Sequence, residues 1–228
     1  MTATSPFSDI KACVFDAYGT LLDVNAAAER CRGDLGDNAG PLAEIWRAKQ
    51  LQYTWLSSLM GQHRDFRELT ERGLEYAMES LGLDDAELQA KLMDLYEVLD
   101  AYPEVPDMLG TLKQSGMKTA ILSNGTSDML DAAATAGGIK SNLDAILSIE
   151  EVGIFKPDPR VYQLAVDRLG VAKENICFVS SNGWHATGAA AFGFQVAWVN
   201  RAGLVQEKLG FDPKVILKDL KGLAELVL

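Results

Sequence analysis

The chain has 228 residues, of which 48% are hydrophobic and 23% are charged. Such a composition is typical of a globular protein with one large domain or a domain with a sizeable insertion, and it excludes a disordered chain. A formal net charge of −11 argues against nucleic acids and anionic membranes as partners, because both attract basic surfaces. A small anionic substrate would need cations supplied by its own site, and Arg47 and Lys156 are the candidates.

The cysteines and the start of the chain indicate a cellular compartment. Cys13, Cys31 and Cys177 are odd in number and lack a CxxC spacing, which argues against a disulfide scaffold or a zinc site. Residues 1–9 lack a basic start and an apolar stretch, and no apolar run is long enough to cross a bilayer. We therefore expect a cytoplasmic enzyme with no membrane partner.

The first predicted element is a buried strand over Ile10 to Phe15, followed by a tight turn at Gly19. This places Asp16 at the carboxyl end of a strand, which is where ligands bind in open α/β sheets. The alternative is that Asp16 only caps the turn.

A helical pattern follows the first strand and continues to about Leu99. Apolar residues recur at helical spacing, and we expect helices over Pro41–Met60, Phe66–Leu81 and Asp84–Leu99. In the first of these the apolar positions are Leu42, Ile45, Trp46, Leu56 and Leu59. Residues 25–99 are thus predicted to form a helical insertion the size of a small domain, with residues 1–24 and 100–228 as the core.

Strand and helix signals alternate from Tyr102 onward. Strands are expected at Thr119–Leu122, Ala145–Ile149, Ile176–Ser180 and Gln195–Val199, and helices at Pro106–Ser115, Ser127–Ala136, Arg160–Leu169 and Ala186–Phe192. This alternation predicts an α/β fold with a doubly wound, Rossmann-like parallel sheet.

Polar residues follow three of these strands, as Asp16 follows the first. They are Ser123-Asn124-Gly125, Lys156-Pro157-Asp158-Pro159, and Ser180-Ser181-Asn182-Gly183-Trp184-His185. In order and spacing, these motifs and the segment Trp46 to Leu56 resemble the L-2-haloacid dehalogenases of the haloacid dehalogenase-like hydrolases, over nearly the whole chain from Ile10. The resemblance implies a helical cap inserted after the first strand.

The motifs also discriminate between reactions within that superfamily. Its phosphatases carry a second aspartate two residues after the nucleophile and acidic magnesium ligands in the last motif, whereas this chain has Tyr18 at the first position and no carboxylate in Ser180 to His185. Without a divalent ion, Asp16 and a phosphate would repel each other. We therefore expect carbon–halide hydrolysis through an aspartyl ester on Asp16, with no metal and no cofactor.

The resemblance assigns further roles. Arg47 would bind the leaving halide with Asn124, although on a helix face it could simply be solvated. Ser123, with backbone amides near Ala17 and Tyr18, would bind the substrate carboxylate; the alternative for Ser123 is a helix N-cap. Lys156 would keep Asp16 ionised. Four residues match the polar positions that orient the family's site, namely Thr20, Tyr162, Ser180 and Asn182. Four others match the apolar walls of that site, namely Tyr18, Leu51, Phe66 and Trp184. Each of the eight could instead be a turn or packing residue.

His185 departs from the family, which usually has an aspartate there to activate water. A neutral imidazole can serve as that base. One alternative is a natural variant in which hydrolysis of the ester is slowed. The other is a substitution introduced to trap the ester. Asp23 could orient His185, but we favour a role in capping the first cap helix.

These features together predict hydrolysis of short L-2-haloalkanoic acids to 2-hydroxy acids with inversion. One alternative is another activated carbon, as in azetidine-2-carboxylate or fluoroacetate, and a second is a catalytically silent relative. The aromatic and Met-rich helix Trp46–Met60 would suit a homodimer contact or the core of the cap itself.

Overall fold

A single parallel sheet forms the core of the chain in the computed structural model, which describes residues 5–24 and 26–228. Six strands lie in the order β3-β2-β1-β4-β5-β6, so the first strand is central. The strands are β1 (Ala12–Phe15), β2 (Lys118–Ser123), β3 (Ala145–Ser148), β4 (Ile176–Ser180), β5 (Gln195–Val199) and β6 (Val215–Leu217). This confirms the predicted α/β fold class.

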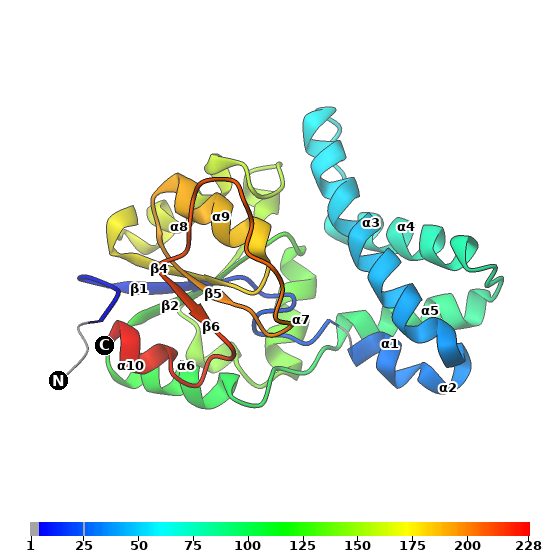
Figure 1. Ribbon diagram of the computed structural model, residues 1–228, viewed down its shortest axis with the longest axis horizontal. Helices are drawn as coiled ribbons and strands as arrows, with labels where there is room; N and C mark the ends of the chain where they lie inside the picture. The colour runs from blue at the N-terminus through cyan, green and yellow to red at the C-terminus, as the bar shows by residue number, and fades with distance from the viewer. Residues whose placement is uncertain (1–4, 25) are drawn as a thin grey trace.

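Helices cover both faces of this sheet. In Figure 1, α8 and α9 lie above the strands, and α6 and α10 lie below them. These helices and α7 are α6 (Val105–Gln114), α7 (Ser127–Ala136), α8 (Pro159–Leu169), α9 (Gly183–Phe192) and α10 (Leu223–Val227). Short 3-10 turns occur at η1 (Gly36–Asn38), η2 (Lys140–Asn142), η3 (Ile149–Glu151) and η4 (Lys173–Asn175). Because strands β1 and β4 are buried on both faces, they form continuous apolar runs rather than alternating ones, apart from Ser180 at the end of β4.

A separate group of helices is inserted between β1 and β2 and lies to one side of the sheet (Figure 1). They are α1 (Ala26–Arg30), α2 (Arg32–Leu35), α3 (Ala39–Leu59), α4 (Phe66–Ser80) and α5 (Ala86–Glu97). Asp65 and Asp85 cap α4 and α5 by accepting hydrogen bonds from backbone N–H groups three residues on. This is the expected helical cap; its limits at residues 25 and 99 stay a prediction, and residue 25 lies outside the described residues.

The apolar positions of α3 are not all buried. Leu56 and Leu59 are 43% and 84% exposed, so they do not belong to the core of the cap. Its buried face toward the C-terminus instead carries Gln50, Thr54 and Ser57. The helix can bury these polar groups because each has a hydrogen-bond partner. Gln50 donates to Thr70 of α4, whereas the hydroxyls of Thr54 and Ser57 donate to the backbone oxygens of Leu51 in the same helix and Gln62 just after it.

One boundary near the site and several short elements were also missed. The helix α9 begins at Gly183 rather than Ala186, which places His185 in its first turn. The strand β6 has only three residues and is half exposed, so it lacks a clear apolar run. The short helices α1 and α10 have five residues each and were likewise not predicted.

The two cysteines of the sheet are buried. Cys13 and Cys177 are free, and they lie opposite each other on β1 and β4. Within the described part of the chain, no helix is long and apolar enough to cross a membrane.

Gly188 allows α9 to pack closely on the segment before α8. A Cβ at this position would lie 2.7 Å from Pro157 Cβ and 2.7 Å from Tyr162 Oη. We expect Gly188→Ala to lower the free energy of unfolding by about 1–3 kcal/mol, because the packed neighbours cannot yield without strain. Urea unfolding provides the measurement. Gly40→Ala on the exposed start of α3, where a Cβ meets nothing within 4 Å, is the control, and equal stability of the two variants would contradict the packing argument.

Candidate active site

The site is organised around Asp16, the first residue after the central strand β1. Its backbone N–H donates to Val179 O of β4 at 2.9 Å, which extends the sheet by one residue. Gly19 then turns the chain with φ +83°, a conformation that favours glycine. The Asp16 carboxylate therefore lies at the carboxyl edge of the sheet, as predicted, and its Oδ1 accepts a hydrogen bond from the Ala17 N–H at 3.1 Å.

A buried ion pair joins Asp16 to Lys156. Lys156 Nζ lies 3.0 Å from Asp16 Oδ1, and the two side chains are 1% and 8% exposed respectively. The ammonium also donates to Leu122 O at 2.7 Å. Burial lowers the pKa of Lys156, although the Asp16 charge partly opposes this change. Burial would raise the pKa of Asp16, but Lys156 and, when it is protonated, His185 together more than offset that, and the pKa of Asp16 lies far below its usual range.

Three further side chains donate hydrogen bonds to Asp16 Oδ2. The distances are 2.7 Å from Asn182 Nδ2, 3.2 Å from Ser180 Oγ and 3.4 Å from Thr20 Oγ1. Hydrogen bonds to the ionised form favour ionisation, so they act in the same direction as Lys156. The structure thus brings the predicted orienting residues Thr20, Ser180 and Asn182 to one carboxylate oxygen.

His185 is fully buried beside the same oxygen. Its Nδ1 lies 3.5 Å from Asp16 Oδ2 and 3.3 Å from Ser180 Oγ. The ring packs against Trp184 and Phe178, and among the described residues its Nε2 has no hydrogen-bond partner. Burial and the nearby Lys156 lower the pKa of His185 to about 4, so the imidazole is neutral at neutral pH. Lys156 is then the cation that keeps Asp16 ionised.

A small pocket opens above the carboxylate, between the sheet and the cap. It has room for about one water molecule. Its walls combine polar and apolar side chains from the sheet edge, α3 and α4. They are Asp16, Tyr18, Arg47, Leu51, Phe66, Ser123, Asn124, Lys156, Asn182 and Trp184. Ten residues predicted for the site are therefore adjacent in the fold.

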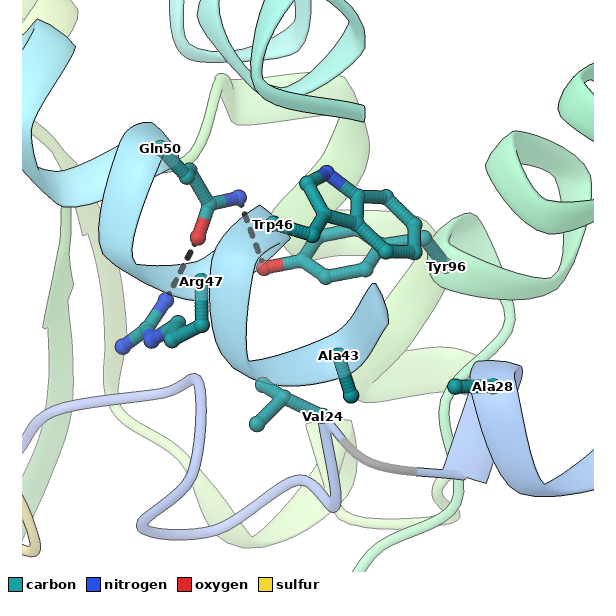
Figure 2. Close-up of a pocket in the computed structure, with 7 residues that line it drawn as sticks. All are labelled: Val24, Ala28, Ala43, Trp46, Arg47, Gln50 and Tyr96. Carbon is teal, nitrogen blue, oxygen red and sulfur yellow. Dashed lines mark hydrogen bonds between the residues drawn. The ribbon is translucent and has the colours of Figure 1, made fainter. Parts of the chain in front are cut away.

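Arg47 reaches this pocket from α3. Its Nη2 donates to Asn182 Oδ1 at 3.2 Å, and its Nη1 donates to Gln50 Oε1 at 2.6 Å. Figure 2 shows the Arg47–Gln50 pair at the edge of a second small cavity, lined also by Trp46 and Tyr96. The guanidinium therefore contacts the site and is not simply solvated on a helix face.

Ser123 and Asn124 close the pocket from the end of β2. Ser123 Oγ accepts a hydrogen bond from the Gly125 N–H at 3.2 Å, and the N-cap of α7 is Thr126, so the alternative of Ser123 as a helix N-cap was wrong. Asn124 Oδ1 accepts from the Lys156 N–H at 3.2 Å. The Asn124 amide nitrogen is consequently the group that can donate to a ligand.

Two tyrosines lie at different depths. Tyr18 lines the pocket and stacks on Tyr96 of the cap with ring centroids 5.5 Å apart. Tyr162 lies deeper, and its hydroxyl donates to the backbone oxygen of His185 at 3.5 Å. Tyr162 therefore contacts the base candidate rather than the walls of the pocket. For Asp23, the structure shows its carboxylate accepting from Tyr102 Oη at 3.5 Å; whether it orients His185 stays a prediction.

Sequence reasoning missed three residues that support the site. Gln50 holds Arg47, and Ser181 donates its N–H to Thr20 Oγ1 at 2.8 Å. Arg201 donates to Thr20 O at 3.1 Å and pairs with Glu104 at 2.7 Å. The one available signal was the spacing of Gln50, three residues after Arg47 on the same helix. Nothing in the sequence near Arg201 indicated its contact with the first loop.

The donor set around Asp16 does not form a metal site. Within residues 5–24 and 26–228, no three His, Cys, Asp or Glu side chains are grouped so that they could hold an ion. The nearest cation is the ammonium of Lys156. That the reaction needs no metal stays a prediction.

The fold and the motifs match known proteins over most of the chain. The model of the haloacid dehalogenase-like hydrolases matches residues 10–193. The chain is 47% identical to (S)-2-haloacid dehalogenase 1 from Pseudomonas sp. strain CBS-3, over 96% of this chain and 97% of that protein. It is 36% identical to haloacetate dehalogenase H-2 from Moraxella sp. strain B, over 96% and 98%. The chain therefore belongs to the haloacid dehalogenase-like hydrolases.

A solved structure narrows the class further. The L-2-haloacid dehalogenase from Xanthobacter autotrophicus with chloropropionic acid covalently bound superposes with a TM-score of 0.89, at 35% identity, over 96% of this chain and 98% of that one. Within the hydrolase class, this chain is a member of the (S)-2-haloacid dehalogenase family, as its motifs predicted.

Removing the Lys156 ammonium tests the electrostatic account of Asp16. We expect Lys156→Met to raise the pKa of the Asp16 carboxyl, because burial would then act without its main counterweight. The measurement is a pH titration of the ¹³C-labelled aspartate carboxyl signals by NMR. Lys221→Met, which alters an exposed ammonium paired with Asp219, should leave the Asp16 signal unchanged. An unchanged Asp16 titration in Lys156→Met would contradict the assignment.

Proposed function

We propose that this chain hydrolyses the carbon–halogen bond of short L-2-haloalkanoic acids and forms 2-hydroxy acids with inversion. The observation that carries the proposal is an ionised, buried Asp16 whose pocket contains Arg47 and Lys156 and has apolar walls. Two cations suit a substrate that brings a carboxylate and releases a halide. The covalently bound chloropropionic acid in the Xanthobacter autotrophicus enzyme supports a covalent route.

In the first step, an Asp16 carboxylate oxygen attacks the carbon that bears the halogen. A carbon–oxygen bond forms, the carbon–halogen bond breaks, and the halide leaves with the bonding electron pair, so no proton is needed. Arg47 and the Asn124 amide stabilise the departing halide, while Ser123 and the backbone N–H groups near Ala17 and Tyr18 bind the substrate carboxylate. In-line attack inverts the carbon.

In the second step, water attacks the Asp16 carbonyl carbon of the alkyl ester. His185 Nδ1 accepts a proton of that water, the acyl carbon–oxygen bond breaks, and the imidazolium returns the proton to the leaving alkoxide, which departs as the 2-hydroxy acid. The carboxyl proton left on Asp16 is released to solvent, and this restores the ionised nucleophile. This role requires the imidazole proton on Nε2 once the ester has formed, when Asp16 no longer presents a charged oxygen to Nδ1. The lowered pKa, about 4, supports the proposal, because the imidazole is then neutral at neutral pH and free to accept a proton.

Phosphoryl transfer is a poorer fit to the same residues. Tyr18 stands where phosphatases of the superfamily carry an acidic proton donor. Burial raises the pKa of Tyr18 well above its ordinary value, so the hydroxyl is a weak acid. A general acid for a departing alkoxide is missing among the residues that line the described pocket.

A second candidate keeps the aspartyl ester but accepts another activated carbon, such as that of fluoroacetate or azetidine-2-carboxylate. The identity of 36% to a haloacetate dehalogenase favours the inclusion of haloacetates. A catalytically silent relative is the remaining alternative, and it depends on His185 failing as a base.

Three further properties are part of the proposal. We propose a homodimer, for which the end of α3 and the residue after it offer the exposed apolar side chains of Leu56, Leu59 and Met60. We also propose a cytoplasmic location, consistent with three free, buried cysteines, and a reaction without metal or cofactor.

The central test is a halide-release panel over both enantiomers of 2-chloropropionate and over haloacetates, including fluoroacetate. We expect chloride release from the L-enantiomer and a loss on the order of 10⁴-fold or more in Asp16→Asn, because the nucleophile is gone. The exposed Asp128→Asn is the matched control. In a single turnover in ¹⁸O-water, the label should enter Asp16. Release of halide by Asp16→Asn at the native rate would overturn the proposal.

The pH dependence of ester hydrolysis tests His185. A lowered pKa means that the base is neutral, and active, above pH about 4, and that hydrolysis slows as the pH falls through that value. In a rapid-quench single turnover we expect the acid limb there, rather than near the ordinary histidine value. His185→Asn should accumulate the ester, detected as added mass on Asp16, and His185→Asp should restore its hydrolysis. Native hydrolysis in His185→Asn would remove histidine from the mechanism.

A further inference from the structure

Gln50 is a buried amide at the point where three cap helices meet. It is 1% exposed and lies on α3, between Thr70 of α4 and Tyr96 of α5. The helices approach closely here because α4 has a glycine opposite it: a Cβ at Gly73 would lie 3.1 Å from the backbone nitrogen of Gln50. Burying an amide without hydrogen-bond partners costs free energy, so the cap must supply partners for Gln50.

Hydrogen bonding fixes the direction of this amide. The Thr70 hydroxyl donates to Phe66 O at 2.6 Å, so Thr70 Oγ1 is left as an acceptor for Gln50 Nε2 at 2.7 Å. The same nitrogen donates to Tyr96 Oη at 2.9 Å. With both donors of the nitrogen used, the Gln50 oxygen must face away from Thr70.

That oxygen faces Arg47, as Figure 2 shows, and accepts from Nη1 at 2.6 Å. The other end of the guanidinium donates to Asn182 Oδ1 at 3.2 Å, and Asn182 Nδ2 donates to Asp16 Oδ2 at 2.7 Å. A chain of hydrogen bonds therefore connects Thr70, Gln50, Arg47, Asn182 and Asp16, and Arg47 donates toward both ends of it. We call this the cap-to-core chain.

We infer that Gln50 is a positioning residue that aims the Arg47 guanidinium into the pocket while leaving its charge free for the departing halide. The inference rests on the proposed function, in which Arg47 meets that halide. A neutral amide oxygen suits the task, because it accepts a hydrogen bond from Arg47 without cancelling the positive charge. A carboxylate at the same place would pair with Arg47 and compete with the halide.

The experiment compares four variants by first-turnover halide release from the 2-chloro and 2-bromo substrates. Gln50→Met removes the acceptor at similar length, and Gln50→Glu keeps an acceptor but adds a charge. Thr70→Val removes the group that fixes the amide, and Thr70→Ser retains it. Thr54→Val is the matched control, because this threonine is buried on the same helix and its hydroxyl donates to Leu51 O at 2.7 Å, outside the cap-to-core chain.

We expect Gln50→Met and Gln50→Glu to slow chloride release by about tenfold or more, which corresponds to one hydrogen bond to a charged group. Bromide release should slow less, since bromide is the better leaving group, and KM should change less than kcat. Thr70→Val should change the rate in the same direction, with Thr70→Ser and Thr54→Val close to native. Thermal unfolding of each variant checks that it folds, and the Thr70 pair decides the question if a Gln50 variant does not fold.

A readout without turnover separates this inference from the proposed function. Bromide quenching of tryptophan fluorescence, with Trp184 in the pocket wall, measures anion binding, and Gln50→Met should weaken it about tenfold. If the native protein released no halide, the proposed function would be overturned. The role of Gln50 would still be decided by the bromide-binding measurement. Unchanged bromide binding and unchanged chloride-to-bromide rate ratios in both Gln50→Met and Thr70→Val would overturn the inference.

Discussion

The buried ion pair between Asp16 and Lys156 is the constraint on which the rest of the site depends. Two charges that are almost completely removed from water are stable only if each is paired and hydrogen-bonded. Asp16 meets that requirement with a cation on one oxygen and three neutral donors on the other. The outcome is a carboxylate that stays ionised inside an apolar pocket, which is the state a nucleophile requires.

The same electrostatics set the properties of the neighbouring histidine. Because Lys156 already supplies the positive charge beside Asp16, a second cation at His185 would be disfavoured, and burial acts in the same direction. A histidine can thus occupy the position of an acidic residue while remaining uncharged at neutral pH. Arg47 of the cap donates a hydrogen bond to Asn182, and Asn182 donates one to Asp16. The position of the cap is therefore linked to the hydrogen bonds of the nucleophile.

Prediction from sequence succeeded where one local signal dominated. The run Gln195–Val199 and the helix Ser127–Ala136 were predicted with the bounds that the structure shows, because a continuous apolar run and a regular helical pattern each admit one interpretation. It left open whether the apolar side chains at the end of α3 belong to the core of the cap or to a dimer contact, and in the structure Leu59 is 84% exposed. It also missed β6, which is too short to carry a pattern.

The sequence by itself determined which chemical groups are available. It places a carboxylate after the first strand, hydroxyl and amide groups after two other strands, a lysine after the remaining one, and Tyr18 where the phosphatases carry a second aspartate. Because all these groups follow strands, and parallel strands end at the same edge of the sheet, the sequence also indicated that they meet. Only the tertiary structure decided how these groups pair, the depth of His185 and hence its lowered pKa, and the part played by Gln50. These properties depend on burial and on hydrogen-bond direction between segments far apart in the chain, which no local pattern records.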